Sequence, residues 1–98
     1  MKTNIKIIAK MPVAPENAPK FKELAKELVE KSQQEPGNVY YSLNETDDPG
    51  MLVFVECWKD KDAIRAHNAM EHFTRILPQL RELCNGSPSK EVYSEVEF

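Results

Sequence analysis

The chain has 98 residues, of which 16 are acidic and 13 are basic, so its formal net charge is −3. This length predicts one domain, spanning residues 1–98, with a modest core that oligomerisation would enlarge. Basic residues are interleaved with acidic ones and form no Lys/Arg-rich run. Because nucleic-acid binding needs a basic face, we expect no nucleic-acid partner.

The amino-terminal stretch predicts neither secretion nor membrane insertion. Its longest apolar run, at residues 7–9, lies between two lysines. A secretory signal has an apolar run of about 7–15 residues, and a membrane span needs about 20. We therefore expect a cytoplasmic protein with no membrane association. Cys57 and Cys84 lack C-x-x-C or metal-type spacing and are expected to be free thiols.

The first half of the chain predicts a strand, a helix and a hairpin. Residues 3–11 read as a strand, and a helix follows from about residue 19 and ends before Pro36-Gly37. Residues 38–45 alternate as a strand, residues 51–59 read as a second strand, and a turn at 47–50 joins the two as a hairpin. The helix is indicated by apolar residues at helical spacing, namely Phe21, Leu24, Ala25, Leu28 and Val29.

The second half predicts two helical pieces and a closing strand. Asp60 is expected to cap a helix that carries His67 on its apolar face. The pattern loosens from 68 to 71, a second helical piece covers about 73–83, and residues 90–98 alternate as a strand. The order of elements predicts an α+β, ferredoxin-like fold, with a four-stranded antiparallel sheet and its helices on one face.

The strand at 51–59 is apolar on both of its faces. Two helical segments can cover only one face of a four-stranded sheet, so we expect the other face to pack against a second copy of the chain. A flatter, partly exposed sheet, or a helix that wraps further, is the alternative. One face carries Met51, Val53, Val55 and Cys57, and the other carries Leu52, Phe54 and Trp58.

Three residues on buried faces are candidates for chemistry. His67 follows the apolar face of its helix and has the type of side chain that serves as a general acid or base, although a satisfied core histidine is the alternative. Glu56 lies in the most apolar strand, where a carboxylate needs a hydrogen bond or a charged partner. Trp58, on the same face as Glu56, needs a partner for its indole N–H.

We expect no metal site. His72 is five residues after His67, about 140° away on an ideal helix, so the two should not share a face. No third ligand is suggested, whereas a metal site needs three or four. The sequence also has no Gly-rich phosphate loop and no Cys/His nucleophile pair with supporting context.

The stretch from Phe54 to Phe73 resembles the antibiotic biosynthesis monooxygenase family. A Glu-x-Trp signature is matched by Glu56 and Trp58, and a later His and His-Phe pair are matched by His67 and by His72 with Phe73. The segment Glu35-Pro36-Gly37, followed by an alternating strand, looks like a second hallmark. The resemblance covers essentially the whole chain in its order of elements.

The resemblance implies a dimeric α+β barrel with a pocket between sheet and helices. Several members of the family oxidise quinols or polyketide-derived phenols with dioxygen and need no flavin or metal, so we expect a small aromatic substrate and no cofactor. It implies His67 as the base or hydrogen-bond partner of the substrate oxygen, Glu56 as a polar anchor and Trp58 as a pocket wall, and these three are the expected catalytic residues. The expected pocket residues are Tyr41, Phe54, Ile64, His72 and Phe73.

Two other functions stay open on the same fold. One is a non-oxidative isomerase of a small signal metabolite; phosphorylated substrates would need a basic pocket, for which Arg65, Arg75 and Arg81 are available but not obviously clustered. The other is a non-catalytic ligand-binding or stress-response module. Heme-degrading relatives place a Trp at the position of His67 and a ligating His where Ile76 or Leu77 stands, which argues against heme.

Overall fold

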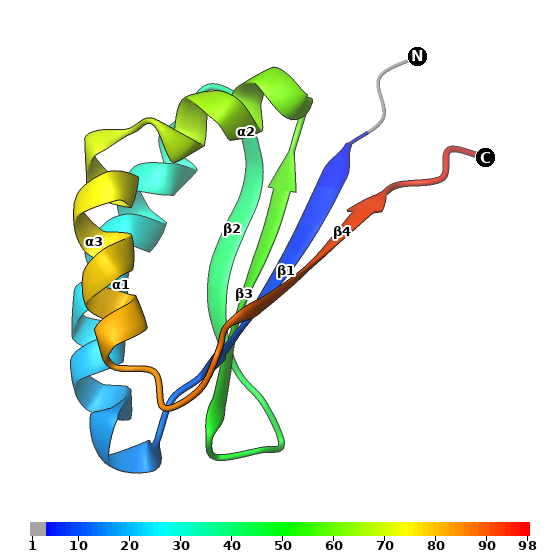
Figure 1. The fold of residues 1–98 in the computed structure, drawn as a ribbon. Coiled ribbons are helices and arrows are strands. Elements are labelled where there is room, and N and C mark those ends of the chain that lie inside the picture. Colours follow the sequence, from blue (N-terminus) through cyan, green and yellow to red (C-terminus); the bar gives the residue numbers. More distant parts are fainter. Residues whose placement is uncertain (1–3) are drawn as a thin grey trace.

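The computed structural model describes residues 4–98, which form two layers, an antiparallel sheet and a set of helices covering one of its faces (Figure 1). The four strands lie in the order β2-β3-β1-β4. This arrangement confirms the predicted α+β, ferredoxin-like fold. In chain order the elements are β1 (Ile5–Pro12), the 3-10 helix η1 (Pro15–Asn17), α1 (Ala18–Gln33), β2 (Asn38–Glu45), β3 (Met51–Trp58), α2 (Lys61–Asn68), α3 (Glu71–Glu82) and β4 (Ser89–Ser94).

Most bounds agree with the sequence pattern, and the clearest difference is at the carboxyl end. The first strand was expected from Thr3, which lies outside the described residues. The closing strand was expected to reach Phe98 but ends at Ser94. Ser94 is the partner of Ile5, the first residue of β1, and the backbone N–H of Glu95 still donates to the carbonyl of Asn4 at 3.0 Å. Residues 95–98 have no regular secondary structure.

Local signals explain where the helices begin and what they bury. The Oδ1 atom of Asp60 accepts a hydrogen bond from the backbone N–H of Ala63 at 2.8 Å, which confirms the predicted cap of α2. The apolar stripe of α1 faces the sheet, where Phe21 and Ala25 are completely buried. The core therefore lies between the helices and the inner face of the sheet.

The inner face of the sheet also carries the polar candidates. Glu56 of β3 lies between Ile7 of β1 and Tyr41 of β2 in the register of the strands. Glu56 and Trp58 are both buried, at 8% and 0% exposure, because α1, α2 and α3 cover this side. The strand pairing therefore places a carboxylate within an apolar layer.

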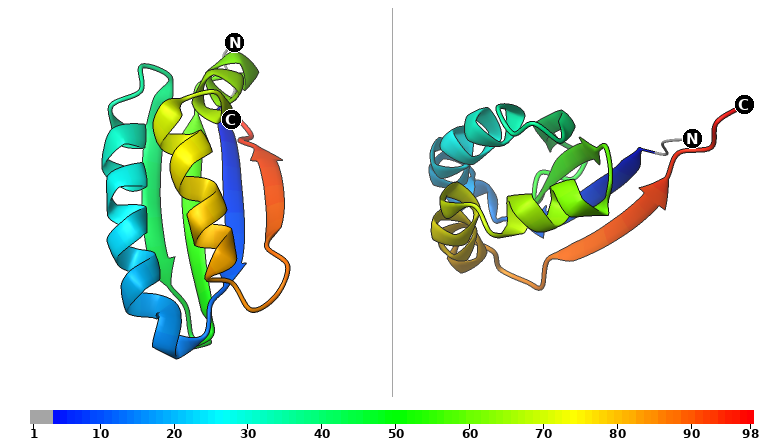
Figure 2. Two further views of the ribbon diagram at one scale, coloured as in Figure 1. Left: turned by 60° about the vertical axis from the view of Figure 1, so that its left-hand side comes forward. Right: turned by 90° about the horizontal axis from the view of Figure 1, so that it is seen from above.

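The outer face of the sheet has no helix over it. Val53 and Val55 of β3 and Ile8 of β1 are half-buried there, and Tyr40 is exposed at 54%. Strand β4 is exposed along its whole length and extends beyond the helical layer (Figure 2). Among the described residues, no helix is both long enough and apolar enough to cross a membrane.

Candidate active site

The centre of the site is one carboxylate oxygen that contacts two histidine rings. The Oε2 atom of Glu35 lies 2.7 Å from Nδ1 of His67 and 2.8 Å from Nε2 of His72. All three side chains are buried, at 8%, 2% and 9% exposure. A carboxylate can only accept hydrogen bonds, so each ring nitrogen donates its N–H to Glu35.

The junction between α2 and α3 brings the two histidines together. His67 is in the last turn of α2 and His72 is in the first turn of α3, and between them Met70 is extended (φ −68°, ψ 145°). The expectation that the two rings would not share a face assumed one continuous helix. Because the helix is interrupted, the ring centroids lie 6.1 Å apart and both rings reach Glu35.

A glycine lets the turn that carries Glu35 approach α2. Glu35 lies in the connection from α1 to β2, where its backbone N–H donates to the carbonyl of Ser32 at 3.1 Å. A Cβ atom at Gly37 would overlap the Cβ atom of Ala63, so only glycine fits this contact without a shift. The close approach holds the carboxylate against the helix that carries His67.

The hydrogen bond from His67 to Glu35 leaves the other ring nitrogen free. With the proton on Nδ1, the Nε2 atom carries a lone pair, and it is buried without a hydrogen-bond partner among residues 4–98. Burial lowers the pKa of His67 more than its contact with Glu35 raises it. The ring is therefore neutral near pH 7, and Nε2 is available as a base.

Aromatic rings surround His67 on several sides. The ring centroid of His67 lies 4.5 Å from that of Trp58, 4.8 Å from that of Phe73 and 5.5 Å from that of Tyr41. Burial, together with the charge of Glu56, raises the pKa of Tyr41, so its hydroxyl stays protonated. The imidazole thus lies in a largely apolar shell.

A cavity of about 210 Å³ lies between the helices and the inner face of the sheet. His67 and Glu56 line it together with apolar side chains of the strands and of α3. The Nε1 atom of Trp58 donates a hydrogen bond to Oε1 of Glu56 at 2.9 Å, yet burial still raises the pKa of this carboxyl. The lining residues are Ile7, Ala9, Met11, Leu28, Tyr41, Phe54, Glu56, Ile64, His67, Asn68, Phe73, Leu77, Arg81, Pro88, Ser89 and Lys90.

The predicted site residues fall into two groups in the structure. Two of them, Trp58 and His72, do not line the cavity but lie directly behind it, hydrogen-bonded to Glu56 and to Glu35. Glu35 had no predicted role, although the Glu-Pro-Gly segment that contains it was part of the family resemblance. The predicted residues that do line the cavity are Tyr41, Phe54, Glu56, Ile64, His67 and Phe73.

Glu35, His67 and His72 also meet the distance requirement for binding a metal ion. Their ligand atoms all lie within 4.8 Å of one another, so the expectation that no third ligand accompanies the histidines is wrong. The two contacts of 2.7 and 2.8 Å to one oxygen are, however, ordinary hydrogen-bond distances. Protons on the two ring nitrogens therefore account for the observed geometry.

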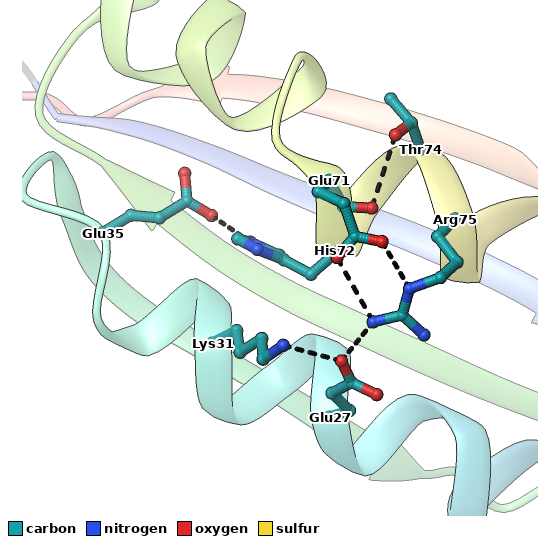
Figure 3. A network of polar contacts seen from close by, with 7 residues as sticks. All are labelled: Glu27, Lys31, Glu35, Glu71, His72, Thr74 and Arg75. Carbon is teal, nitrogen blue, oxygen red and sulfur yellow. Dashed lines mark hydrogen bonds and ion pairs between the residues drawn. The ribbon is translucent and has the colours of Figure 1, made fainter.

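An exposed ion network ties α1 to α3 beside the Glu35–His72 contact (Figure 3). The guanidinium of Arg75 on α3 contacts both Glu71 and Glu27, and Nζ of Lys31 lies 2.8 Å from Oε2 of Glu27. Arg75 and Lys31 together lower the pKa of Glu27 to about 2. The network connects α3, which carries His72, to α1, which ends two residues before Glu35.

Comparison with known proteins identifies the family. The model of the family described as antibiotic biosynthesis monooxygenase matches residues 4–79. "Putative monooxygenase YcnE" of Bacillus subtilis (strain 168) is 36% identical over 72 residues, which cover 72% of this chain and 76% of that protein. The chain belongs to the antibiotic biosynthesis monooxygenase family.

Solved structures of similar proteins agree with this assignment. A crystal structure described as an antibiotic biosynthesis monooxygenase is 36% identical, has a TM-score of 0.88 and covers 95% of this chain and 99% of its own. A conserved protein from Methanosarcina mazei Go1 is 32% identical, with a TM-score of 0.89 and coverage of 93% and 91%. Membership of the antibiotic biosynthesis monooxygenase family supports a general monooxygenase-like function.

The match to the antibiotic biosynthesis monooxygenase family covers most, but not all, of the residues of the candidate site. Residues 4–79 include Glu35, Glu56, His67 and His72, and therefore the whole buried polar cluster. They do not include Arg81 and Lys90, which also line the cavity.

Proposed function

We propose that this protein is a monooxygenase that oxidises a small quinol or phenol with dioxygen, and that His67 is its catalytic base. The observation that carries the proposal is the position of His67. Its ring lines the cavity, its Nδ1–H is held by Glu35, and its Nε2 atom is buried with no partner among residues 4–98. A substrate hydroxyl in the cavity would complete the hydrogen bonding of this atom.

The chemistry needs an electron-rich substrate rather than a bound redox group. Dioxygen has a triplet ground state and reacts slowly with closed-shell molecules, but a phenolate can transfer one electron to it. In the proposed first step, Nε2 of His67 takes the hydroxyl proton. The aromatic shell then shields the anion from water, which keeps it reactive. The dioxygen is the oxidant, and no flavin or metal is required.

For a phenol with a free para position, the atoms and electrons of the remaining steps balance. One electron passes from the phenolate to dioxygen, and the resulting superoxide and phenoxyl radical combine to form a C–O bond at the ring. Protonated His67 returns its proton to the outer peroxide oxygen. The O–O bond then breaks, the ring carbon loses its hydrogen, and water leaves. Phenol plus dioxygen gives quinone plus water, and a quinol gives the corresponding hydroxyquinone in the same way.

The other predicted residues have supporting roles in this proposal. Glu56, fixed by Trp58, would anchor a second polar group of the substrate, and its raised pKa lets it donate a hydrogen bond when protonated. Tyr41, Phe54, Ile64 and Phe73 would form the walls of the pocket. His72 would act through Glu35 as a positioning residue, since it does not line the cavity.

The proposal includes a homodimer in the cytoplasm. The uncovered outer face of the sheet carries Ile8, Val53 and Val55, which are apolar and half-buried in the single chain. Packing this face against the same face of a second copy would remove an apolar patch from water, with the sheets about 10 Å apart. This arrangement would leave each cavity between the sheet and helices of its own chain.

Oxygen uptake with menadiol tests the proposed activity. Wild type should consume oxygen faster than the autoxidation of menadiol in buffer, and His67→Ala should lose about a hundredfold or more of that excess. His72→Gln, which removes the other ring donor to Glu35 but keeps Nε2 of His67, should lose much less. If wild type and His67→Ala both remain at the buffer rate with several quinols, the oxidative function is wrong. Conversion of a substrate under nitrogen would indicate an isomerase instead.

A further inference from the structure

The cavity has different chemistry at its two ends. Glu56 lies opposite Ile7 in the sheet, whereas Lys90 of β4 lies opposite Ala9. Lys90 is therefore two strands across from Glu56, about 10 Å, and two residues along, about 7 Å. On α3, Arg81 is eight residues after Phe73, which corresponds to about 12 Å along the helix axis. The acid–base groups and the two cations thus line opposite ends.

The end of the cavity lined by Arg81 and Lys90, here called the cationic end, has no carboxylate paired with either cation among residues 4–98. Neither Arg81 nor Lys90 forms an ion pair within residues 4–98, whereas Lys10 and Arg75 are each paired with a glutamate. Glu56 is the only carboxylate among the lining residues. The formal net charge of the whole chain is −3. This end of the cavity, with its two cations, is therefore opposite in sign to the chain as a whole.

We propose that the substrate carries an acidic substituent, a carboxylate or sulfonate, at the end remote from the hydroxyl that is oxidised, and that Arg81 and Lys90 bind it. The inference rests on the proposed function, because it places the reacting hydroxyl at His67. A guanidinium suits such a group well, since its planar donors match the two oxygens of a carboxylate. Lys90 adds a flexible point charge from the opposite layer.

The size of the cavity limits the substrate further. A volume of about 210 Å³ is below the roughly 300–1,000 Å³ of most ligand sites, and a cavity of roughly 150 Å³ is known to hold benzene. We therefore infer a ligand with one or two rings. Its hydroxyl and its acidic group lie at opposite ends of the ring system, because the acid–base groups and the two cations are offset from each other along the sheet and along α3.

Binding of the acidic substituent by Lys90 must be distinguished from a second role, in which Lys90 balances the charge of Glu56. Its charge acts on Glu56 and lowers the pKa of that carboxyl, although burial outweighs the effect and the pKa is raised overall. The two side chains do not form an ion pair. If Lys90 served only to balance Glu56, its removal would change the binding of neutral and acidic ligands alike. The proposal predicts a change for acidic ligands alone.

Binding measured by calorimetry under nitrogen tests the proposal without turnover. The probes are 6-hydroxy-2-naphthoate, with its groups at opposite ends, 3-hydroxy-2-naphthoate, with its groups adjacent, and the neutral 2-naphthol. We expect the first to bind about tenfold more tightly than 2-naphthol at low salt, and this advantage to decrease as salt is added. The second should show little of the advantage, because its acid cannot reach the cations while its hydroxyl is at His67.

Three variants that each remove one positive charge test which residues bind the acidic group of the probe. Arg81→Gln and Lys90→Gln should each reduce the advantage of the acidic probe about threefold and leave 2-naphthol binding unchanged. Lys26→Gln is the matched control, since Lys26 is also an exposed lysine without an ion pair among the described residues but lies outside this cavity. It should alter neither probe. All three positions are exposed, so the variants should fold, which circular dichroism can verify.

The outcomes separate this inference from the proposed function. Equal affinity for 6-hydroxy-2-naphthoate and 2-naphthol, or equal effects of Lys90→Gln on both, would overturn the acidic substituent. Menadiol oxidation that depends on His67 would in that case still support the monooxygenase. Conversely, selective binding of the acidic probe without oxygen uptake for any quinol would overturn the oxidative function and leave the binding preference in place.

Discussion

Glu35 and His67 are separated by 32 residues in sequence, yet the Oε2 atom of one lies 2.7 Å from the Nδ1 atom of the other in the buried layer of the fold. The contact fixes which ring nitrogen carries the proton, and therefore which nitrogen is available at the cavity. Carboxylate–imidazole pairs of this kind orient the base in many enzymes that transfer protons. Here the pair is formed between a loop and a helix end.

Replacement of Glu35 by glutamine should reduce activity far more than it reduces stability. The amide keeps the size of the side chain, but its NH₂ group can face a ring nitrogen and favour the wrong tautomer of His67. We expect oxygen uptake with menadiol to decrease by about a hundredfold to ten-thousandfold, by analogy with the orienting carboxylate of a catalytic triad. Normal uptake by a folded Glu35→Gln protein would show that the pair has no orienting role.

The pH dependence of activity should follow the neutral form of His67. Because burial lowers the pKa of this ring below its ordinary value of about 6.5, the base form should persist into mildly acidic solution. We expect kcat/KM for menadiol to be constant above about pH 6.5 and to decrease only at lower pH. A decrease that begins well above pH 7 would contradict the lowered pKa.

The same group should make folding less favourable in acid. His67 binds its proton less readily when folded than when unfolded, so the free energy of unfolding decreases as pH falls below about 6.5 and levels off below the folded-state pKa. Urea unfolding of wild type and His67→Gln across this range isolates the contribution. The variant should show a shallower dependence, and identical slopes would exclude His67 as the source.

Trp58→Phe should destabilise the protein through Glu56. The substitution removes the indole N–H that donates to Oε1 of Glu56 at 2.9 Å and leaves a buried oxygen without its partner. A loss of about 1–3 kcal/mol in the free energy of unfolding is expected. In a Glu56→Gln background, where no charge is buried, the same substitution should have a smaller effect. Urea unfolding of the four proteins in this cycle gives the interaction directly.

Val55→Lys should prevent association of the proposed homodimer. Val55 lies on the uncovered outer face of the sheet, between Ile8 and Ser42 in the strand register. A charge there would face its own copy across the interface. Sedimentation should give twice 11.3 kDa for wild type and 11.3 kDa for the variant at micromolar concentration. A wild-type mass of 11.3 kDa would show that the sheet face is not an interface.

Zinc should inhibit the oxidation rather than support it. The ligand atoms of Glu35, His67 and His72 lie within 4.8 Å of one another, so Zn²⁺ can replace the two shared protons. The ion would then take over the groups that orient His67. We expect added Zn²⁺ to reduce oxygen uptake and EDTA to restore it, whereas EDTA alone should leave uptake unchanged. Loss of uptake with EDTA alone would indicate a metal-dependent enzyme.

Periodicity and turn residues were sufficient to predict the fold. The apolar stripe of α1, the alternation in β2, the continuous apolar run of β3 and the Asp60 cap are local signals, and each predicted an element that the structure contains. The end of β4 was predicted less well, because alternation continues through Val96 and Phe98 while the strand ends at Ser94. Alternation shows which residues could share a face but does not encode hydrogen bonds to a neighbouring strand.

The hydrogen-bonded cluster could not be predicted in the same way. Glu35 comes from a turn, and its approach to His67 depends on the close packing of Gly37 against Ala63, which no local pattern encodes. The convergence of His67 and His72 depends on the extended Met70 between two helices. Arg81 was named with Arg65 and Arg75 as available for a basic pocket, but its pairing with Lys90 was not predicted, because only the tertiary fold brings α3 and β4 to the same cavity.

The sharing of one oxygen by two imidazoles has a consequence for how the region tolerates mutation. Substitution of Glu35 removes the partner of both rings, whereas substitution of either histidine leaves the other ring bonded to Glu35. Once Glu35 is replaced, a further change at His72 should therefore add little, in contrast to the additive behaviour of distant sites. The order in which the residues are exchanged thus decides how much each exchange costs.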